Sequence, residues 1–139
     1  MPLISQETLH KKTSQELTLL LYEAALNNLE SAENHIEHDR LEQANKHLQK
    51  TNDILERLGV GINYEAGILA DQLEQLYNYL ADEVVTANLL KDRVRIQHVH
   101  EIILSLFSAM IEAVKDKRVA NDRVNYKQTN AYEQMASYE

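Results

Sequence analysis

The sequence has no cysteine, one proline and three glycines among 139 residues. Without cysteine there is no thiol nucleophile, and the chain fits a reducing compartment. The proline is Pro2 and all three glycines lie between Gly59 and Gly67, so the chain has one strong internal break between long stretches free of helix breakers. This distribution predicts an all-α protein.

The sequence also lacks a long apolar run and a basic-then-hydrophobic leader, so we expect a cytoplasmic protein without membrane insertion. Residues 1–114 carry 9 basic and 18 acidic side chains, whereas residues 115–139 carry 5 and 4. An acidic body argues against nucleic acid and anionic membranes as partners.

Four amphipathic segments follow one another with short connections, which favours an antiparallel four-helix bundle. We expect the first helix to begin at Thr13 or Ser14 as its N-cap, and Asp92 to cap the fourth. The predicted organisation is an N-terminal arm over 1–12, a bundle over 13–114 and a partly ordered or helical tail over 115–139.

The first helix is apolar on two faces. We expect one face to point into the core, and the other to be either buried as well or kept for a partner. The expected core face carries Leu17, Leu20, Leu21, Ala24, Ala32 and Ile36. The second face carries Leu19, Tyr22, Leu26 and Leu29.

Polar and aromatic residues on the later helices give further expectations. Asn45 and Asn52 stand seven residues apart beside the apolar seam of the second helix, where paired asparagines would fix the helix register. Tyr77 and Tyr79 face opposite sides of the third helix. Tyr77 is the core candidate, and Tyr79 is left as surface or interface.

The chain offers little for catalysis or metal binding. The Glu-x-x-His spacing of di-iron bundles occurs only at Glu7–His10, before the expected first helix. The pairs His35/His38 and His98/His100 each supply two ligands, whereas zinc generally takes at least three. There is no phosphate loop and no nucleophile elbow, so we expect no cofactor, no metal and no enzymatic activity.

Three strings of residues, in order and at matching separations, resemble the flagellin export chaperone family FliS over residues 13–114. The family-motif positions within them are Glu16, Tyr77, Ala87, Asn88 and Asp92. The strings are TSQELTLLLYE at 13–23, LYNYL at 76–80, and Ala87-Asn88 followed by Asp92.

The resemblance implies a cytosolic helical-bundle chaperone that binds the C-terminal segment of flagellin, prevents its premature polymerisation and delivers it to the flagellar type III export gate. The export gate and a second flagellin-binding regulator are further candidate partners. A client helix needs apolar surface between helices. The candidate groove residues are Leu17, Leu19, Leu20, Tyr22, Leu26, Leu29 and Tyr79.

The tail is where this chain departs from the family. Members usually begin with an Asn-Pro/Ala-Tyr-x-x-Tyr segment that covers the empty client groove, but residues 1–12 contain no tyrosine. A similar string, Asn130-Ala131-Tyr132, occurs in the tail, which also holds Tyr138. One hypothesis is a groove-covering strap that docks near the ends of the first and fourth helices, with 115–127 as a connector. The other is a chance match.

Two other classes of function stay open at this stage. A structural or regulatory bundle would homodimerise through the same apolar face, so the empty protein is expected to be a monomer or a weak dimer. A bundle enzyme or metal carrier is the third class.

Overall fold

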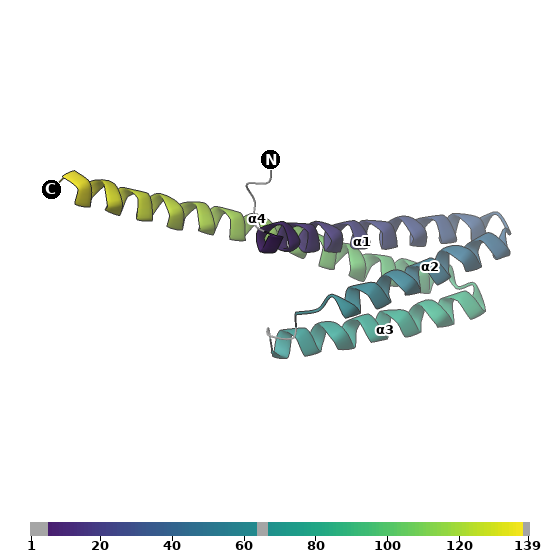
Figure 1. Ribbon diagram of the computed structural model, residues 1–139. Coiled ribbons are helices and arrows are strands. Elements are labelled where there is room, and N and C mark those ends of the chain that lie inside the picture. Colours follow the sequence, from purple (N-terminus) through teal and green to yellow (C-terminus); the bar gives the residue numbers. More distant parts are fainter. Residues whose placement is uncertain (1–5, 64–66, 138–139) are drawn as a thin grey trace. The chain divides into compact units, whose positions relative to one another are not determined.

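The computed structural model describes residues 6–63 and 67–137, with the side chains of 14–63 and 67–116. Four helices make up this part of the chain: α1 (Gln6–Glu37), α2 (Leu41–Val60), α3 (Ile68–Leu90) and α4 (Arg93–Ser137) (Figure 1). The described residues contain no strand. The chain divides into two compact units, Met1–Phe107 and Ser108–Glu139. The first unit holds the predicted bundle, so the all-α fold class is confirmed.

Tight turns make consecutive helices of the first unit antiparallel. Between α1 and α2, Asp39 has φ 59° and the Arg40 amide donates to the His35 carbonyl at 2.7 Å. Between α3 and α4, Lys91 adopts the left-handed conformation that ends many helices. Asp92 Oδ1 then accepts from the Val94 and Arg95 amides at 3.0 and 3.3 Å, which confirms Asp92 as the N-cap of α4.

Polar contacts place the first half of α4 against both α1 and α3. Arg93 Nη2 lies 3.4 Å from Glu33 Oε1 on α1, and Arg95 Nη1 lies 3.2 Å from Glu83 Oε1 on α3. Helix α2 lies beside α1 and α3, so four helices enclose one core. No helix in the described ranges is apolar enough over sufficient length to cross a membrane.

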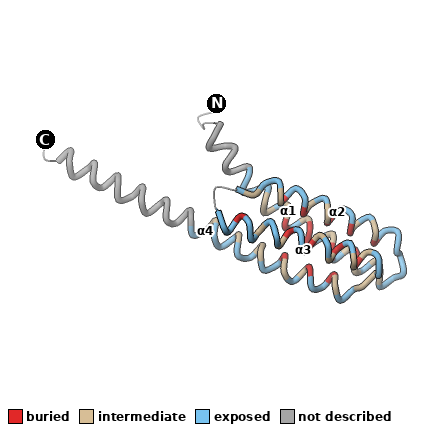
Figure 2. Tube along the Cα trace, turned by 90° about the horizontal axis from the view of Figure 1, so that it is seen from below, coloured by how far each residue is buried: buried red, intermediate tan, exposed pale blue. Residues whose placement is uncertain are grey.

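The buried residues lie on the inner side of each helix of this unit (Figure 2). On α2, α3 and α4 they recur at spacings of three, four and seven residues. They are Ala44, Leu48, Thr51, Leu55 and Leu58 on α2, Ala70, Tyr77, Leu80, Val84 and Ala87 on α3, and Ile96, Val99 and Ile103 on α4. The spacing of apolar residues predicts most of these positions, but it also predicts Leu41 and Leu69 as inner residues, and they are 43% and 64% exposed.

On α1 the prediction of the inner face was only partly right. Ala32 of the expected core face is buried, but Leu17 and Leu20 of that face are 53% and 60% exposed. Tyr22, Leu26 and Leu29 of the second face are buried together with Ala25, which is the first of the two alternatives for that face. Both faces are rich in leucine, so hydrophobicity alone did not distinguish them. Three of the candidate groove residues, Tyr22, Leu26 and Leu29, are thus part of the core.

Helix α1 is longer than the sequence predicted, and α4 continues into the tail that was expected to be partly ordered or helical. Helix α1 begins at Gln6, and Thr18 Oγ1 donates to the Ser14 carbonyl at 3.0 Å, so Ser14 lies inside the helix and is not its cap. Most of the expected arm is therefore helical. Helix α4 continues to Ser137 through the expected connector 115–127. Extending an existing helix needs no new nucleus, and this stretch holds neither proline nor glycine.

The two asparagines beside the α2 seam differ in their contacts. Asn45 Oδ1 accepts from Asn88 Nδ2 at 2.7 Å, which joins α2 to α3 as expected of a register-fixing pair. Asn52 Oδ1 is buried and has no hydrogen-bond partner among the described residues. Only the first asparagine therefore contributes a contact to the fold.

We expect leucine at these two positions to change stability in opposite directions. Asn52→Leu should raise the free energy of unfolding by about 1 kcal/mol, because it removes an unsatisfied buried acceptor. Asn45→Leu should lower it by about 1 kcal/mol, because it leaves the Asn88 amide without its acceptor. Urea unfolding followed by circular dichroism measures both free energies. Because both variants replace Asn by Leu within α2, the difference in helix propensity between these residues cancels when the two variants are compared. A loss of stability in Asn52→Leu would contradict this account.

Candidate functional site

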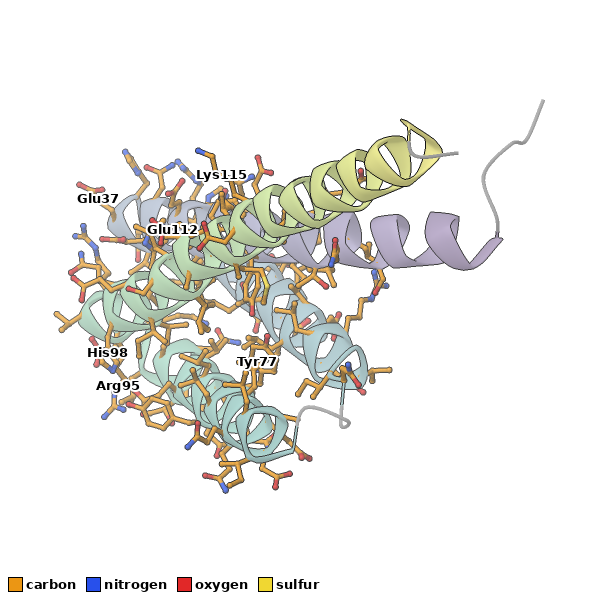
Figure 3. All side chains as sticks on the ribbon, turned by 90° about the vertical axis from the view of Figure 1, so that its left-hand side faces the viewer. Glu37, Tyr77, Arg95, His98, Glu112 and Lys115 are labelled. Atoms are coloured by element: carbon orange, nitrogen blue, oxygen red, sulfur yellow. The ribbon has the colours of Figure 1, made fainter. Side chains whose placement is uncertain are left out.

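A pair of tyrosines joins two helices across the core. The hydroxyl of Tyr22 on α1 is hydrogen bonded to the hydroxyl of Tyr77 on α3, and the Tyr22 ring meets Phe107 edge-on with centroids 6.4 Å apart. Burial raises the pKa of Tyr22, partly offset by the bond to Tyr77, and burial together with the same bond raises the pKa of Tyr77. Both phenols therefore stay protonated and paired. Tyr77 points from α3 into the unit (Figure 3).

One surface groove lies between α1 and α2, and we call it the α1–α2 groove. Its wall on α1 is apolar, whereas α2 supplies two carboxylates, one guanidinium and a valine that is 82% exposed. The adjacent Leu20 is also exposed. The groove is lined by Leu17, Leu21, Asp53, Glu56, Arg57 and Val60.

A second groove, of about 450 Å³, lies between α2 and α3, and we call it the α2–α3 groove. Its lining combines apolar side chains, two carboxylates and two carboxamides. The lining residues are Asn52, Leu55, Glu56, Gly59, Val60, Glu74, Tyr77, Asn78 and Ala81. Glu56 and Val60 line both grooves, so the last turns of α2 form a ridge between them.

The structure brings together only some of the groove residues predicted from sequence. Leu17 lines the α1–α2 groove, Leu20 is exposed one residue before the groove residue Leu21, and Leu19 is half-buried. Tyr79 is 44% exposed and lines neither groove, and its hydroxyl is 3.2 Å from Nε2 of His98 on α4. The sequence analysis overlooked Val60, although an apolar residue between Gly59 and Gly61 was a visible signal.

The family-motif positions mainly fix helix ends. The Ala87 carbonyl accepts from the Asp92 amide at 3.0 Å, and Ala87 itself is fully buried. Asn88 donates to Asn45 and accepts from the Lys91 ammonium. Glu16 is exposed on α1. The motif thus shapes the α3–α4 turn and its contact with α2, while Tyr77 belongs to the core.

Histidines gather at the α1–α2 turn without forming a metal site. The rings of His35 and His47 stack with centroids 5.2 Å apart, and His47 Nδ1 lies 2.8 Å from Asn28 Oδ1. Burial, then the neighbouring His35 and Lys50, lower the pKa of His47. Among the described side chains, no group of three or more His, Asp or Glu residues is placed to hold a metal ion.

A four-helix core with exposed leucines and two surface grooves defines this unit as an all-α helical bundle with apolar side chains left on its surface. The family model described as "Flagellar protein FliS" matches residues 4–118. The chain belongs to the FliS family of flagellar secretion chaperones. A curated relative, "Flagellar secretion chaperone FliS" of Bacillus subtilis (strain 168), is 27% identical over 113 residues, which cover 81% of this chain and 84% of that protein.

We expect the tyrosine pair to behave as a coupled unit. Tyr22→Phe or Tyr77→Phe alone should lower the free energy of unfolding by about 1–2 kcal/mol, because each leaves one buried hydroxyl unpaired. The double variant should recover much of that loss, because neither hydroxyl remains. A double-mutant cycle from urea unfolding measures this coupling, and additive single effects would contradict it.

Proposed function

We propose that this protein is a cytoplasmic export chaperone that binds the C-terminal segment of flagellin, prevents its premature polymerisation and delivers it to the flagellar type III export gate. Membership of the FliS family supports the class of function. The relative from Bacillus subtilis carries the name of a flagellar secretion chaperone. The client and the export gate are our proposal for this chain.

The observation that carries the proposal is the apolar edge of the α1–α2 groove. Leu17, Leu20 and Val60 are all more than half exposed, although the core of the unit closes without them. Burying each such side chain gains roughly 1.5–3 kcal/mol. An amphipathic client helix that lays its apolar face along this edge would obtain that gain, as in other helix-in-groove complexes.

The burial pattern divides the seven groove candidates into different roles. We propose that Leu17 and Leu20 contact the client directly and that Leu19 lies at the margin of the contact. Tyr22, Leu26 and Leu29 are buried, so they support the groove by holding α1 in place. Tyr79 lies beside α4 and would serve a separate contact.

The test is binding of a recombinant flagellin C-terminal segment by isothermal titration calorimetry. The full chain should form a 1:1 complex and delay flagellin polymerisation measured by light scattering. Leu17→Glu/Leu20→Glu should raise Kd at least tenfold, since about 1.4 kcal/mol corresponds to one decade. Leu89→Glu is the control, because Leu89 is 80% exposed at the α3–α4 turn. Equal loss in both variants would contradict the assignment.

The same leucines allow a second candidate function, a structural or regulatory bundle that pairs with a second copy. Sedimentation of the isolated chain separates the two. A monomer that becomes a 1:1 complex with flagellin supports the chaperone. A stable dimer that does not bind flagellin supports the pairing function instead. In that case Leu17→Glu/Leu20→Glu should be a monomer.

We also propose that the tail acts as a displaceable strap over the client surface through Asn130, Ala131 and Tyr132. The backbone is helical through these residues, so the strap would bind as a helix. Tyr138 lies outside the described residues. A covering segment must be weak enough for the client to displace it, which suits a contact made by few aromatic side chains.

Removing the strap contact should strengthen client binding. Tyr132→Ala should lower Kd for the flagellin segment several-fold, because the client no longer competes with the tail. Tyr126→Ala is the matched control, since it removes a tail tyrosine outside the Asn-Ala-Tyr string. If Tyr132→Ala changed neither the affinity nor the hydrogen exchange of tail amides, the strap proposal would be wrong.

A further inference from the structure

The side-chain oxygen of Asn52 makes no hydrogen bond in the fold. This Oδ1 atom is buried without a partner in the described part of the chain, and an unsatisfied buried acceptor is destabilising. Asn45, one heptad earlier, has a partner on α3 and accounts for the helix register. A buried polar group that the fold does not satisfy requires another explanation.

The position of Asn52 in a groove offers an explanation for its unpaired oxygen. It lines the α2–α3 groove, where Leu55, Tyr77 and Ala81 provide apolar surface. Rotation of its terminal amide is a soft torsion, so the oxygen can turn toward the groove when a donor arrives. Asn52 thus brings to the wall of this groove an acceptor that the fold leaves unpaired.

Two carboxylates define the charge of the same groove. Glu56 comes from α2 and Glu74 from α3, and both are exposed. Neither makes an ion pair with any side chain in the described ranges. Two unpaired negative charges beside an apolar surface favour an occupant that carries a basic side chain next to apolar ones.

We propose that Asn52 is a polar anchor for the client. A helix of the flagellin C-terminal segment lies in the α2–α3 groove and presents a lysine or arginine between Glu56 and Glu74. A donor on that helix bonds to Asn52 Oδ1. This inference rests on the proposed flagellin-binding function and adds the chemistry by which one groove selects its occupant.

The anchor implies that Asn52 favours binding at the expense of stability. Asn52→Leu should unfold at higher urea concentration than the natural chain and yet bind the flagellin segment about tenfold more weakly. Asn45→Leu is the matched control, because it should lose stability without losing affinity. A residue that only supported the fold would change both properties in the same direction.

A second variant tests the charge without touching the core. Glu56→Gln/Glu74→Gln should weaken binding several-fold at low salt and reduce the dependence of Kd on salt concentration. The reason is that the variant lacks the charge pairs between these glutamates and the client, which salt screens in the natural chain. Asp82→Asn is its control, since it removes an exposed α3 carboxylate that does not line the groove.

Titration of the full chains with the recombinant flagellin segment, at two salt concentrations, distinguishes the outcomes. If the natural chain does not bind, the proposed function fails. If it binds and Asn52→Leu leaves Kd unchanged, the anchor is wrong while the function stands. If Glu56→Gln/Glu74→Gln binds with the same salt dependence as the natural chain, the client does not place a basic side chain between the two glutamates. If Asn52→Leu alters only self-association, the groove takes a second copy of this chain.

Discussion

The hydrogen bond between the hydroxyls of Tyr22 and Tyr77 is the constraint on which the surface depends. It joins α1 to α3 through the middle of the bundle, where an unpaired hydroxyl would be costly. The bond is made in one rotation of α1 about its axis, the one in which Tyr22 faces Tyr77. The same rotation buries Leu26 and Leu29 and leaves Leu17 and Leu20 outside.

The sequence predicted the parts of the fold that depend on local chemistry. Glycine, proline and capping residues predicted the number of helices and the start of α4, and the spacing of apolar residues predicted most of the inner faces of α2, α3 and α4. The rotation of α1 was not predictable from hydrophobicity, because both of its faces carry leucines. It depends on contacts between helices that are far apart in sequence, such as the Tyr22–Tyr77 pair, and the periodicity of one helix does not show such contacts.

The site was predicted less completely for the same reason. The exposed leucines of α1 were among the candidates, but the role of α2 was not, because each groove needs two helices separated in sequence. The start of α1 was predicted too late in the chain, whereas a helical tail was one of the two expectations for residues 115–139. Continuation of an existing helix needs no new nucleus and little burial, so apolar spacing does not show where such a helix begins or ends.

Glu56 and Val60 are shared by both grooves, which has a thermodynamic consequence. Two helices bound on opposite sides of α2 would touch the same two side chains. The rotamers of Glu56 and Val60 that one bound helix favours would therefore change the groove surface that the other helix contacts. Such linkage is reciprocal, since each bound segment must change the affinity of the other by the same factor. A client that placed a helix in each groove would therefore meet the two grooves as one coupled receptor.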